Sequence, residues 1–162
     1  MKQLIFLIIA VVLAIAATVL AFIFVVPEKR REKLNVSFVI DTLEYLRKGG
    51  RIGGVASVAG SLLKIKPIIS CNEEGSYYTV EKIRGAKAGK EKLLHHVEAF
   101  CGGRPALLAL MNGGAQEEAA AIKPILKKII KQGKIVAEDQ ITATLAINTG
   151  PGLVGIGILV DP

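Results

Sequence analysis

Short segments rich in β-branched and other apolar residues recur along the chain after its first 35 residues and predict strands. The expected strands are Val36 to Ile40, Lys66 to Cys71, Tyr77 to Arg84, Pro105 to Met111, Ile135 to Ala137, Ile141 to Ile147 and Val154 to Val160. The polar segment NEEGS joins the second to the third, so we expect these two to pair antiparallel. Pro105 to Met111 has no polar side chain, which favours a central strand covered on both faces.

Helical periodicity is clearest from Gln116 to Gln132. One apolar stripe is predicted there, formed by Ile122, Ile125, Leu126, Ile129 and Ile130. A second helix is expected over Lys87 to Cys101, and a short one over LEYLRK that ends at Gly49 and Gly50. A further helix is expected over Ile52 to Lys64, whose three glycines suggest a close approach to another surface or to a ligand.

These elements predict one α/β (α+β) domain in which helices pack on a mixed, largely antiparallel sheet. The first residues of the chain predict something different. Leu4 to Val26 is a run of 23 residues without a charge, and about 20 helical residues cross the roughly 30 Å hydrocarbon layer. We therefore expect one transmembrane helix before the domain, with residues 1–27 as the anchor, 28–35 as a basic juxtamembrane linker and 36–162 as the soluble domain.

A cleaved signal peptide is the alternative to the anchor. Its apolar core is usually about 7–15 residues long, and no small-x-small cleavage site follows the run before Pro27. The basic residues beyond the run outnumber the single Lys2 before it; they are Lys29, Arg30, Arg31 and Lys33. The positive-inside rule therefore predicts a single-pass protein of the cell membrane with its soluble domain in the cytoplasm.

Composition excludes several kinds of function. The net charge of +7 comes partly from the juxtamembrane cluster, and no basic motif with interleaved aromatic residues is present, so nucleic acid is not an expected partner. Cys71 and Cys101 stand alone without metal-ligand spacing, so we expect free thiols, no metal and no cofactor. One disulfide between them is the alternative if the domain faces outward. No activated serine or acid/base carboxylate pair is evident, so an enzyme is not predicted.

Two glycine-containing segments carry the candidate chemistry. In LRKGGR, the guanidinium of Arg51 can hold a carboxylate through two parallel hydrogen bonds, and the apolar run Ile52 to Ile65 can line a core or an acyl pocket. In NTGPG, the N–H groups of Gly150 and Gly152 and the hydroxyl of Thr149 can point at an oxyanion. The alternatives need no ligand: an arginine that stabilises its own turn, and a tight hairpin between two strands.

The order of several segments resembles one known family. DTLEYLRKGGRI followed by GSLLKIKPII, then SYYTVEKIRGAKAGKEKL, and finally NTGPGLVGIG are similar to the second domain of DegV-family proteins, the bacterial fatty-acid-binding proteins. The resemblance spans Val36 to Asp161. It implies that Arg51 lies at a fatty-acid site. Asn148 stands where the family's usual histidine precedes TGPG, and the first domain, which supplies hydroxyl ligands for the carboxylate, is missing.

The apolar run and the resemblance together predict a membrane-anchored lipid-binding module, and its expected ligand-binding residues are Arg51, Asn148, Thr149, Gly150 and Gly152. Its expected partners are a fatty acid or other lipid, the membrane, and a fatty-acid kinase that converts the bound acid to acyl phosphate. A chain that supplies the missing domain, or a second copy, is a further expected partner. The alternatives are a degenerate interaction module without a ligand and a fragment or fusion of a longer protein.

Overall fold

A computed structural model describes residues 32–56, 65–84 and 86–162 of the chain. The chain divides into two compact units, Met1–Lys33 and Leu34–Pro162. The sheet and the helices described below belong to the second unit.

The predicted transmembrane segment, Leu4 to Val26, lies outside the described residues. Within the described ranges, no helix is both long enough and apolar enough to cross a bilayer. Membrane anchoring therefore stays a prediction from the sequence.

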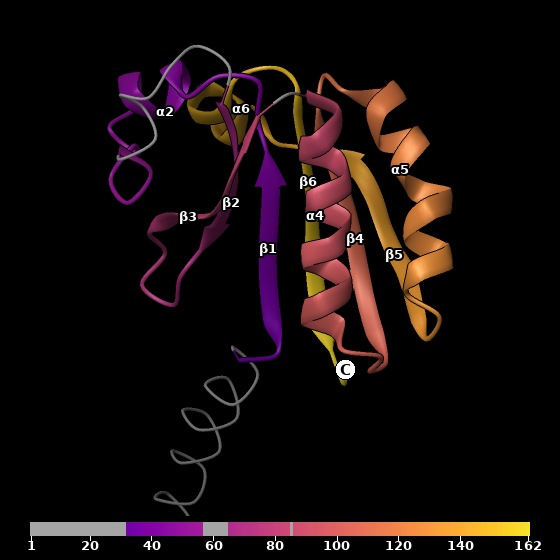
Figure 1. Ribbon diagram of the computed structural model, residues 1–162. Helices are drawn as coiled ribbons and strands as arrows, with labels where there is room; N and C mark the ends of the chain where they lie inside the picture. Colours follow the sequence, from indigo (N-terminus) through magenta and orange to yellow (C-terminus); the bar gives the residue numbers. More distant parts are fainter. Residues whose placement is uncertain (1–31, 57–64, 85) are drawn as a thin grey trace, which may run out of the picture. The chain divides into compact units, whose positions relative to one another are not determined.

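The described residues form a six-stranded sheet with the strand order β3-β2-β1-β6-β4-β5 (Figure 1). The strands are β1 (Leu34–Val39), β2 (Ile65–Cys71), β3 (Tyr77–Arg84), β4 (Ala106–Gly113), β5 (Gly133–Gln140) and β6 (Leu153–Val160). The helices are α2 (Glu44–Lys48), α4 (Ala86–Cys101), α5 (Gln116–Ile129) and α6 (Ala143–Thr149). β4 and β5 pair in parallel, and every other neighbouring pair is antiparallel. This confirms the predicted mixed, largely antiparallel sheet.

β6 lies between β1 and β4 and pairs antiparallel with both. Its sequence explains this central place, because Val154, Ile156 and Ile158 alternate at period two and are all buried on one face. Gly155 and Gly157 occupy the other face of the same strand. One continuous apolar surface therefore runs across the middle of the sheet.

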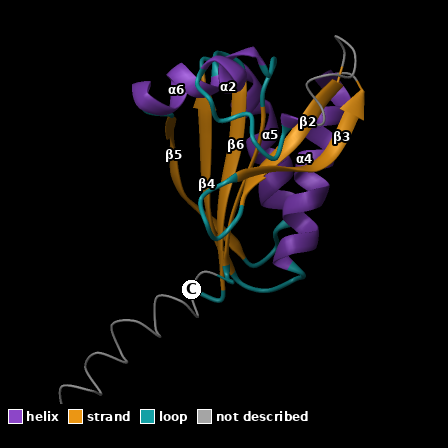
Figure 2. Ribbon diagram, turned by 90° about the vertical axis from the view of Figure 1, so that its left-hand side faces the viewer, coloured by secondary structure: helices purple, strands orange, loops and turns teal. Residues whose placement is uncertain are grey.

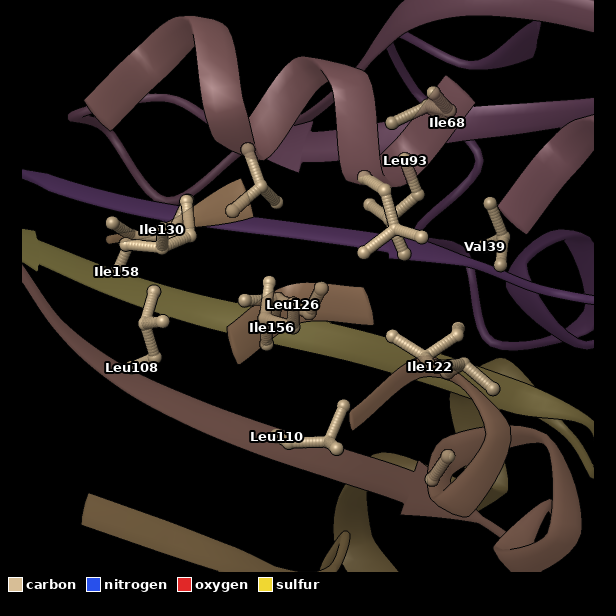
Figure 3. Close-up of a cluster of buried hydrophobic side chains, with 14 of the residues drawn as sticks. Val39, Ile68, Leu93, Leu108, Leu110, Ile122, Leu126, Ile130, Ile156 and Ile158 are labelled. Atoms are coloured by element: carbon tan, nitrogen blue, oxygen red, sulfur yellow. The ribbon is translucent and has the colours of Figure 1, made fainter. Parts of the chain in front are cut away.

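Helices α4 and α5 cover the face of the sheet that carries these apolar residues (Figures 1 and 2). Figure 3 shows Leu93 of α4 beside Ile68 of β2, and Leu126 of α5 over Ile156 of β6. All four side chains are fully buried. Each contributes roughly 1.5–3 kcal/mol through removal from water, so this layer is the main core of the domain.

A second, smaller core lies on the opposite face of the sheet, near its upper end in Figure 1. Its buried members are Phe38, Ile40, Leu46, Val55, Ile69 and Leu153. Phe38 also packs edge-to-face on Tyr77, with ring centroids 5.5 Å apart. This cluster attaches α2 to the sheet and so fixes the segment that leads to the predicted Arg51 site.

One edge of the sheet collects the loops that matter for function. β1, β4 and β5 end there and β2 and β6 begin there, as their pairing directions require. We call it the upper edge, since it is at the top in Figure 1, where α2 and α6 also lie. The first turns of α4 and α5 reach the same edge.

Several predicted elements differ from the observed ones. Ile141 to Ile147 was expected as a strand, but this prediction is wrong, because α6 occupies Ala143–Thr149. The predicted helix over Ile52 to Lys64 lies mostly outside the described residues. Its described start is a turn, in which Gly54 forms an isolated bridge with Tyr78.

Two burial predictions are also wrong. Ile125 is 47% exposed whereas Ile122 is 2% exposed, because Ile125 lies at the margin of the α5 stripe. β4 is not covered on both faces. Leu108 and Leu110 are buried under the helices, but Leu107 on the opposite face is only half-buried.

Candidate functional site

The two predicted functional segments, about 100 residues apart in sequence, meet at the upper edge of the sheet. α2 contacts α6 there. A Cβ atom at Gly49 would lie 2.2 Å from Oδ1 of Asn148, and one at Gly150 would lie 2.3 Å from the ring of Tyr45. Both distances are far below van der Waals contact, so a side chain at Gly49 would displace the amide of Asn148 and one at Gly150 would displace the ring of Tyr45.

NTGPG does not form the expected hairpin. It is the end of α6 and the turn into β6, with Gly150 at φ 74° and Gly152 at φ 86°. The N–H of Gly150 donates to the carbonyl of Ala146 at 2.8 Å, and the N–H of Gly152 donates to the carbonyl of Gly113 at 2.8 Å. The expectation that these two N–H groups are free to bind an oxyanion is therefore wrong.

The two polar side chains of the loop also have partners in the helix. Nδ2 of Asn148 donates to the carbonyl of Thr144 at 3.0 Å. Thr149 is fully buried, and its hydroxyl donates to the carbonyl of Leu145 at 3.0 Å. Both bonds follow the i to i−4 pattern by which such side chains bond the preceding turn of a helix. Thr149 thus stabilises the end of α6 in this structure, and Asn148 is the more accessible of the two.

Arg51 is exposed, and it holds its own turn. Its Nη1 donates to the carbonyl of Gly49 at 2.6 Å, and its backbone N–H donates to the carbonyl of Leu46 at 2.8 Å. Burial raises the pKa of the Tyr77 hydroxyl, and the positive charge of Arg51 opposes that rise. The guanidinium is therefore close enough to Tyr77, at the start of β3, to act on it through its charge. The turn-stabilising role is therefore present, and the guanidinium still has donors that face solvent.

A pocket of about 250 Å³ opens at the upper edge on the helix-covered side of the sheet. Pro151 and Gly152 of the NTGPG loop form part of its wall. Val39, Ile40 and Val154, from the end of β1 and the start of β6, supply its apolar lining. One of the two predicted segments therefore borders a pocket whose lining combines apolar and charged residues, whereas Arg51 and Asn148 lie outside that lining.

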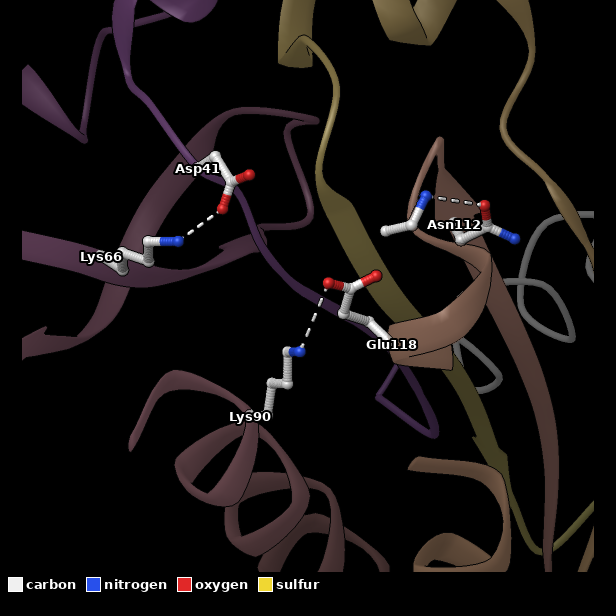
Figure 4. A network of polar contacts seen from close by, with 6 residues as sticks. Asp41, Lys66, Lys90, Asn112 and Glu118 are labelled. Carbon is white, nitrogen blue, oxygen red and sulfur yellow. Dashed lines mark hydrogen bonds and ion pairs between the residues drawn. The ribbon is translucent and has the colours of Figure 1, made fainter. Parts of the chain in front are cut away.

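Four charged side chains surround this pocket and form two ion pairs (Figure 4). Lys66 of β2 lies 2.5 Å from Oδ1 of Asp41. Lys90 of α4 lies 3.8 Å from Oε1 of Glu118 on α5. The first pair is a hydrogen bond as well as a charge contact, whereas the second is too long for a hydrogen bond.

These four residues were not predictable from the sequence. Asp41, Lys66, Lys90 and Glu118 come from four separate elements, and no local motif connects them. A usable signal was Gly89, a glycine inside the predicted helix Lys87 to Cys101, where it costs about 1 kcal/mol relative to alanine. In the structure Gly89 is buried and lines the pocket, which its missing side chain helps to keep open.

The described part of the chain contains no group of three or more His, Cys, Asp or Glu residues placed to hold a metal ion. Cys71 and Cys101 are free thiols, as predicted. Burial raises the pKa of the Cys101 thiol, so it is protonated and unreactive at neutral pH. The chemistry available at the upper edge is therefore apolar contact together with charge and hydrogen bonding.

The chain matches a known protein family over most of its length. It matches the family described as "Uncharacterised protein, DegV family" over residues 8–161. The match is longer than the resemblance over Val36 to Asp161. It begins inside the apolar run Leu4 to Val26, so it gives no separate support to an anchor outside the family domain.

Two curated relatives give the scale of the similarity. A DegV domain-containing protein from Clostridium acetobutylicum is 40% identical over 130 residues, which cover 80% of this chain and 46% of that protein. A DegV domain-containing protein from Clostridium perfringens is 40% identical over 135 residues, which cover 79% and 45% of the two chains. The chain therefore spans about half the length of the curated relatives it matches.

Solved structures show the same fold. The chain is similar to a fatty acid binding DegV family protein from Streptococcus agalactiae, with a TM-score of 0.72, 28% identity and coverage of 83% of this chain and 47% of that one. It is also similar to a DegV family protein from Thermus thermophilus described by its fatty acid binding, with a TM-score of 0.71, 29% identity and coverage of 82% and 48%.

Proposed function

The chain belongs to the DegV family, and from this premise we propose that it is a membrane-anchored module that binds a fatty acid and corresponds to the second half of a DegV protein. Its role is to bind and present a ligand, without catalysing a reaction. The fatty acid binding of the Streptococcus agalactiae and Thermus thermophilus proteins supports the ligand class.

One observation carries the proposal. The turn that bears Arg51 and the loop that bears Asn148 to Gly152 come together at one edge of the sheet, and the loop walls a pocket lined by apolar and charged side chains. Apolar and cationic groups in one lining suit an acyl chain with a carboxylate. Each buried methylene contributes about 0.8 kcal/mol before ordering costs.

The size of the pocket supports a site that another chain completes. At about 250 Å³ it is smaller than the roughly 300–1,000 Å³ of typical small-molecule pockets. The chain also covers less than half of its curated relatives. We propose that a partner chain or a second copy supplies the remaining wall, and that a fatty-acid kinase takes up the presented ligand.

A second candidate function is an interaction module that has kept the fold and lost the ligand. The engaged N–H groups of Gly150 and Gly152 favour it, because they leave fewer donors for a carboxylate. Asn148 favours it too, since an amide side chain cannot become cationic as a histidine can.

Mass spectrometry of lipid that co-purifies with the full-length chain separates the two functions. We expect bound fatty acid on the unmodified chain and at least about tenfold weaker retention after Arg51→Ala, the loss expected for one charge-assisted hydrogen bond. Arg104→Ala is the matched control. Arg104 also donates to carbonyls at the end of a helix, Cys101 and Phe100, but it lies at the opposite edge of the sheet. An unmodified chain that carries no fatty acid would contradict binding by this chain alone and would favour the interaction module.

A further inference from the structure

The charged residues of α5 and β5 are divided between the two ends of the sheet. Acidic residues lie near the upper edge, in the first turn of α5 and the last half of β5; they are Glu117, Glu118, Glu138 and Asp139. Four lysines lie at the opposite end, which we call the lower edge (bottom of Figure 1); they are Lys127, Lys128, Lys131 and Lys134. Lys123, halfway along α5, forms an ion pair with Glu138. This side of the domain is therefore positive at its lower edge and negative at its upper edge.

The four lysines of the lower edge carry charge that the domain does not neutralise. All four are exposed, and none forms an ion pair within the part of the chain that the structure describes. At the same edge Arg104 lies 3.6 Å from Asp161, so that pair is balanced, and Glu98 in the last turn of α4 leaves the lysines in excess. Glu73 and Glu74 belong to the turn after β2, which is four strands from β5, or about 20 Å.

Stabilisation of the helix explains only half of this cluster. Basic residues in the last turn of a helix complement its dipole, which accounts for Lys127 and Lys128. The effect falls off beyond the last turn, and α5 ends at Ile129, so it does not account for Lys131 and Lys134. A negatively charged partner at the lower edge accounts for all four.

The preceding part of the chain joins the domain at this same edge. β1 begins there with Leu34, next to the residues predicted as a basic linker. Leu34 is 55% exposed and Val36 is 43% exposed, so the start of β1 also presents apolar side chains. An anchor that precedes Leu34 would therefore bring the lower edge, and not the upper one, to the membrane surface.

We propose that the lower edge of the domain binds the anionic lipid surface of the membrane through these four lysines. The inference rests on the proposed membrane anchoring and adds the orientation of the domain. β4 crosses the sheet with eight residues, which separates the two edges by roughly 25 Å. Because charge effects decay over about 8 Å at physiological ionic strength, the acidic upper edge avoids the anionic surface. The GGR turn and the NTGPG loop then face away from the bilayer, where a soluble kinase can reach a bound fatty acid.

Acetylation of lysines in lipid nanodiscs tests this orientation. The full-length chain is inserted into nanodiscs of phosphatidylcholine alone and into nanodiscs of equal parts phosphatidylcholine and phosphatidylglycerol. Acetylation rates of individual lysines are then measured by mass spectrometry. We expect the anionic lipid to slow acetylation of the four lysines about fivefold, as contact of each with an anionic surface implies. Lys48 of α2 and Lys82 of β3 are exposed but lie away from the lower edge, so they should react at the same rate in both nanodiscs.

Removal of half of the cluster tests the role of its charge. Lys131→Gln combined with Lys134→Gln should abolish most of the protection of the other two lysines. Lys48→Gln combined with Lys82→Gln is the matched control, because it removes the same two charges away from the lower edge, and it should leave the protection unchanged. All four substituted side chains are exposed, so we expect the fold to be kept, and thermal unfolding checks this. Salt at about 1 M should also abolish the protection, since it shortens the screening length to about 3 Å.

The outcomes separate the orientation from the anchoring. If the chain inserts into neither kind of nanodisc, both are overturned. If it inserts and the four lysines react equally in both, or if Lys48 and Lys82 are protected instead, the anchor stands and the orientation is wrong. If polyuridylic acid slows acetylation of the four lysines in neutral nanodiscs more than phosphatidylglycerol does, the cluster binds nucleic acid and its assignment to lipid is wrong.

Discussion

At the scale of single residues, two glycines at the upper edge have different reasons to be glycine. Gly150 has φ 74°, and a Cβ there would also lie 2.3 Å from the ring of Tyr45. Gly50 has a similar φ of 69° but has no heavy atom within 4 Å of such a Cβ. A side chain at either position would strain the backbone, but only a side chain at Gly150 would also clash with a neighbouring ring.

This difference yields a prediction about stability. Gly50→Ala should lower the free energy of unfolding by about 1–2 kcal/mol, the cost of a left-handed conformation for an L-residue. Gly150→Ala should lower it by about 2–5 kcal/mol, because displacement of the Tyr45 ring adds to the same backbone cost. Urea denaturation measures both. Equal losses would show that α2 and α6 do not pack as closely as the structure has them.

Sequence motifs predicted that two segments would contribute to one site. Arg51 and Asn148 to Gly152 were singled out because each lies in a short motif with local glycines, and the structure brings the two segments close together, whereas their role in binding stays a prediction. Lys90 and Glu118 were not, because their relation depends on how α4 and α5 pack, and nothing in their own sequence neighbourhoods connects them. The hydrogen bonds of the Gly150 and Gly152 N–H groups were equally unpredictable, because their acceptors are the carbonyl of Ala146 in α6 and the carbonyl of Gly113 at the distant end of β4.

At the scale of elements, most strands and the two long helices were predictable, because continuous apolar runs and period-3.6 stripes are strong signals. The failure at Ile141 to Ile147 has a clear cause. Its residues alternate between apolar and small or polar side chains, which favours a strand. The chain leaves the sheet when the N–H of Ile141 bonds the carbonyl of Asn112, and a helix then begins because the N–H groups of Leu145 and Ala146 both donate to Thr142.

The packing of α4 on the sheet predicts a dependence of stability on pH. Nε2 of His96 is buried and has no hydrogen-bond partner among the described residues. Burial lowers the pKa of His96, Glu81 acts to raise it and His95 acts to lower it further. The folded state therefore disfavours the charged imidazole, while the unfolded chain takes up a proton near pH 6.5.

The sign follows from linkage. Below about pH 6.5 the unfolded state binds more protons than the folded state at His96, so the free energy of unfolding should fall as the pH falls from about 7.5 to about 5.5. His96→Gln should remove this part of the dependence. His95→Gln, a substitution of the exposed neighbour, should retain it. Urea denaturation at several pH values measures the effect, and an unchanged slope in His96→Gln would contradict the assignment.

At the scale of the whole molecule, the proposed module joins a domain of the DegV family to a segment with the length and composition of a membrane span. Leu4 to Val26 is long enough to cross the bilayer, and the cluster from Lys29 to Lys33 would attract anionic lipid by about 1 kcal/mol per basic residue near the surface. A tether of this kind would keep a pocket for fatty acids next to its lipid source. The membrane would then supply both the ligand and the point of attachment.

Membrane attachment is testable by fractionation of the full-length chain. We expect it to sediment with membranes and to resist extraction by alkaline carbonate. Ile15→Arg combined with Val19→Arg should release it, because each arginine near the centre of a span costs about 2.5–3.5 kcal/mol by insertion scales. The same positions changed to leucine form the control and should leave the chain in the membrane.

The family match explains what it would mean if the chain did not stay with the membranes. It begins at residue 8, within the apolar run, so the alternative to a membrane span is a segment of the family domain. The unmodified chain would then appear in the carbonate-soluble fraction, and the two arginines would lower its thermal stability by burying charges in a core rather than release it from a bilayer. Fractionation and thermal unfolding of the same three proteins therefore distinguish a membrane span from a core segment.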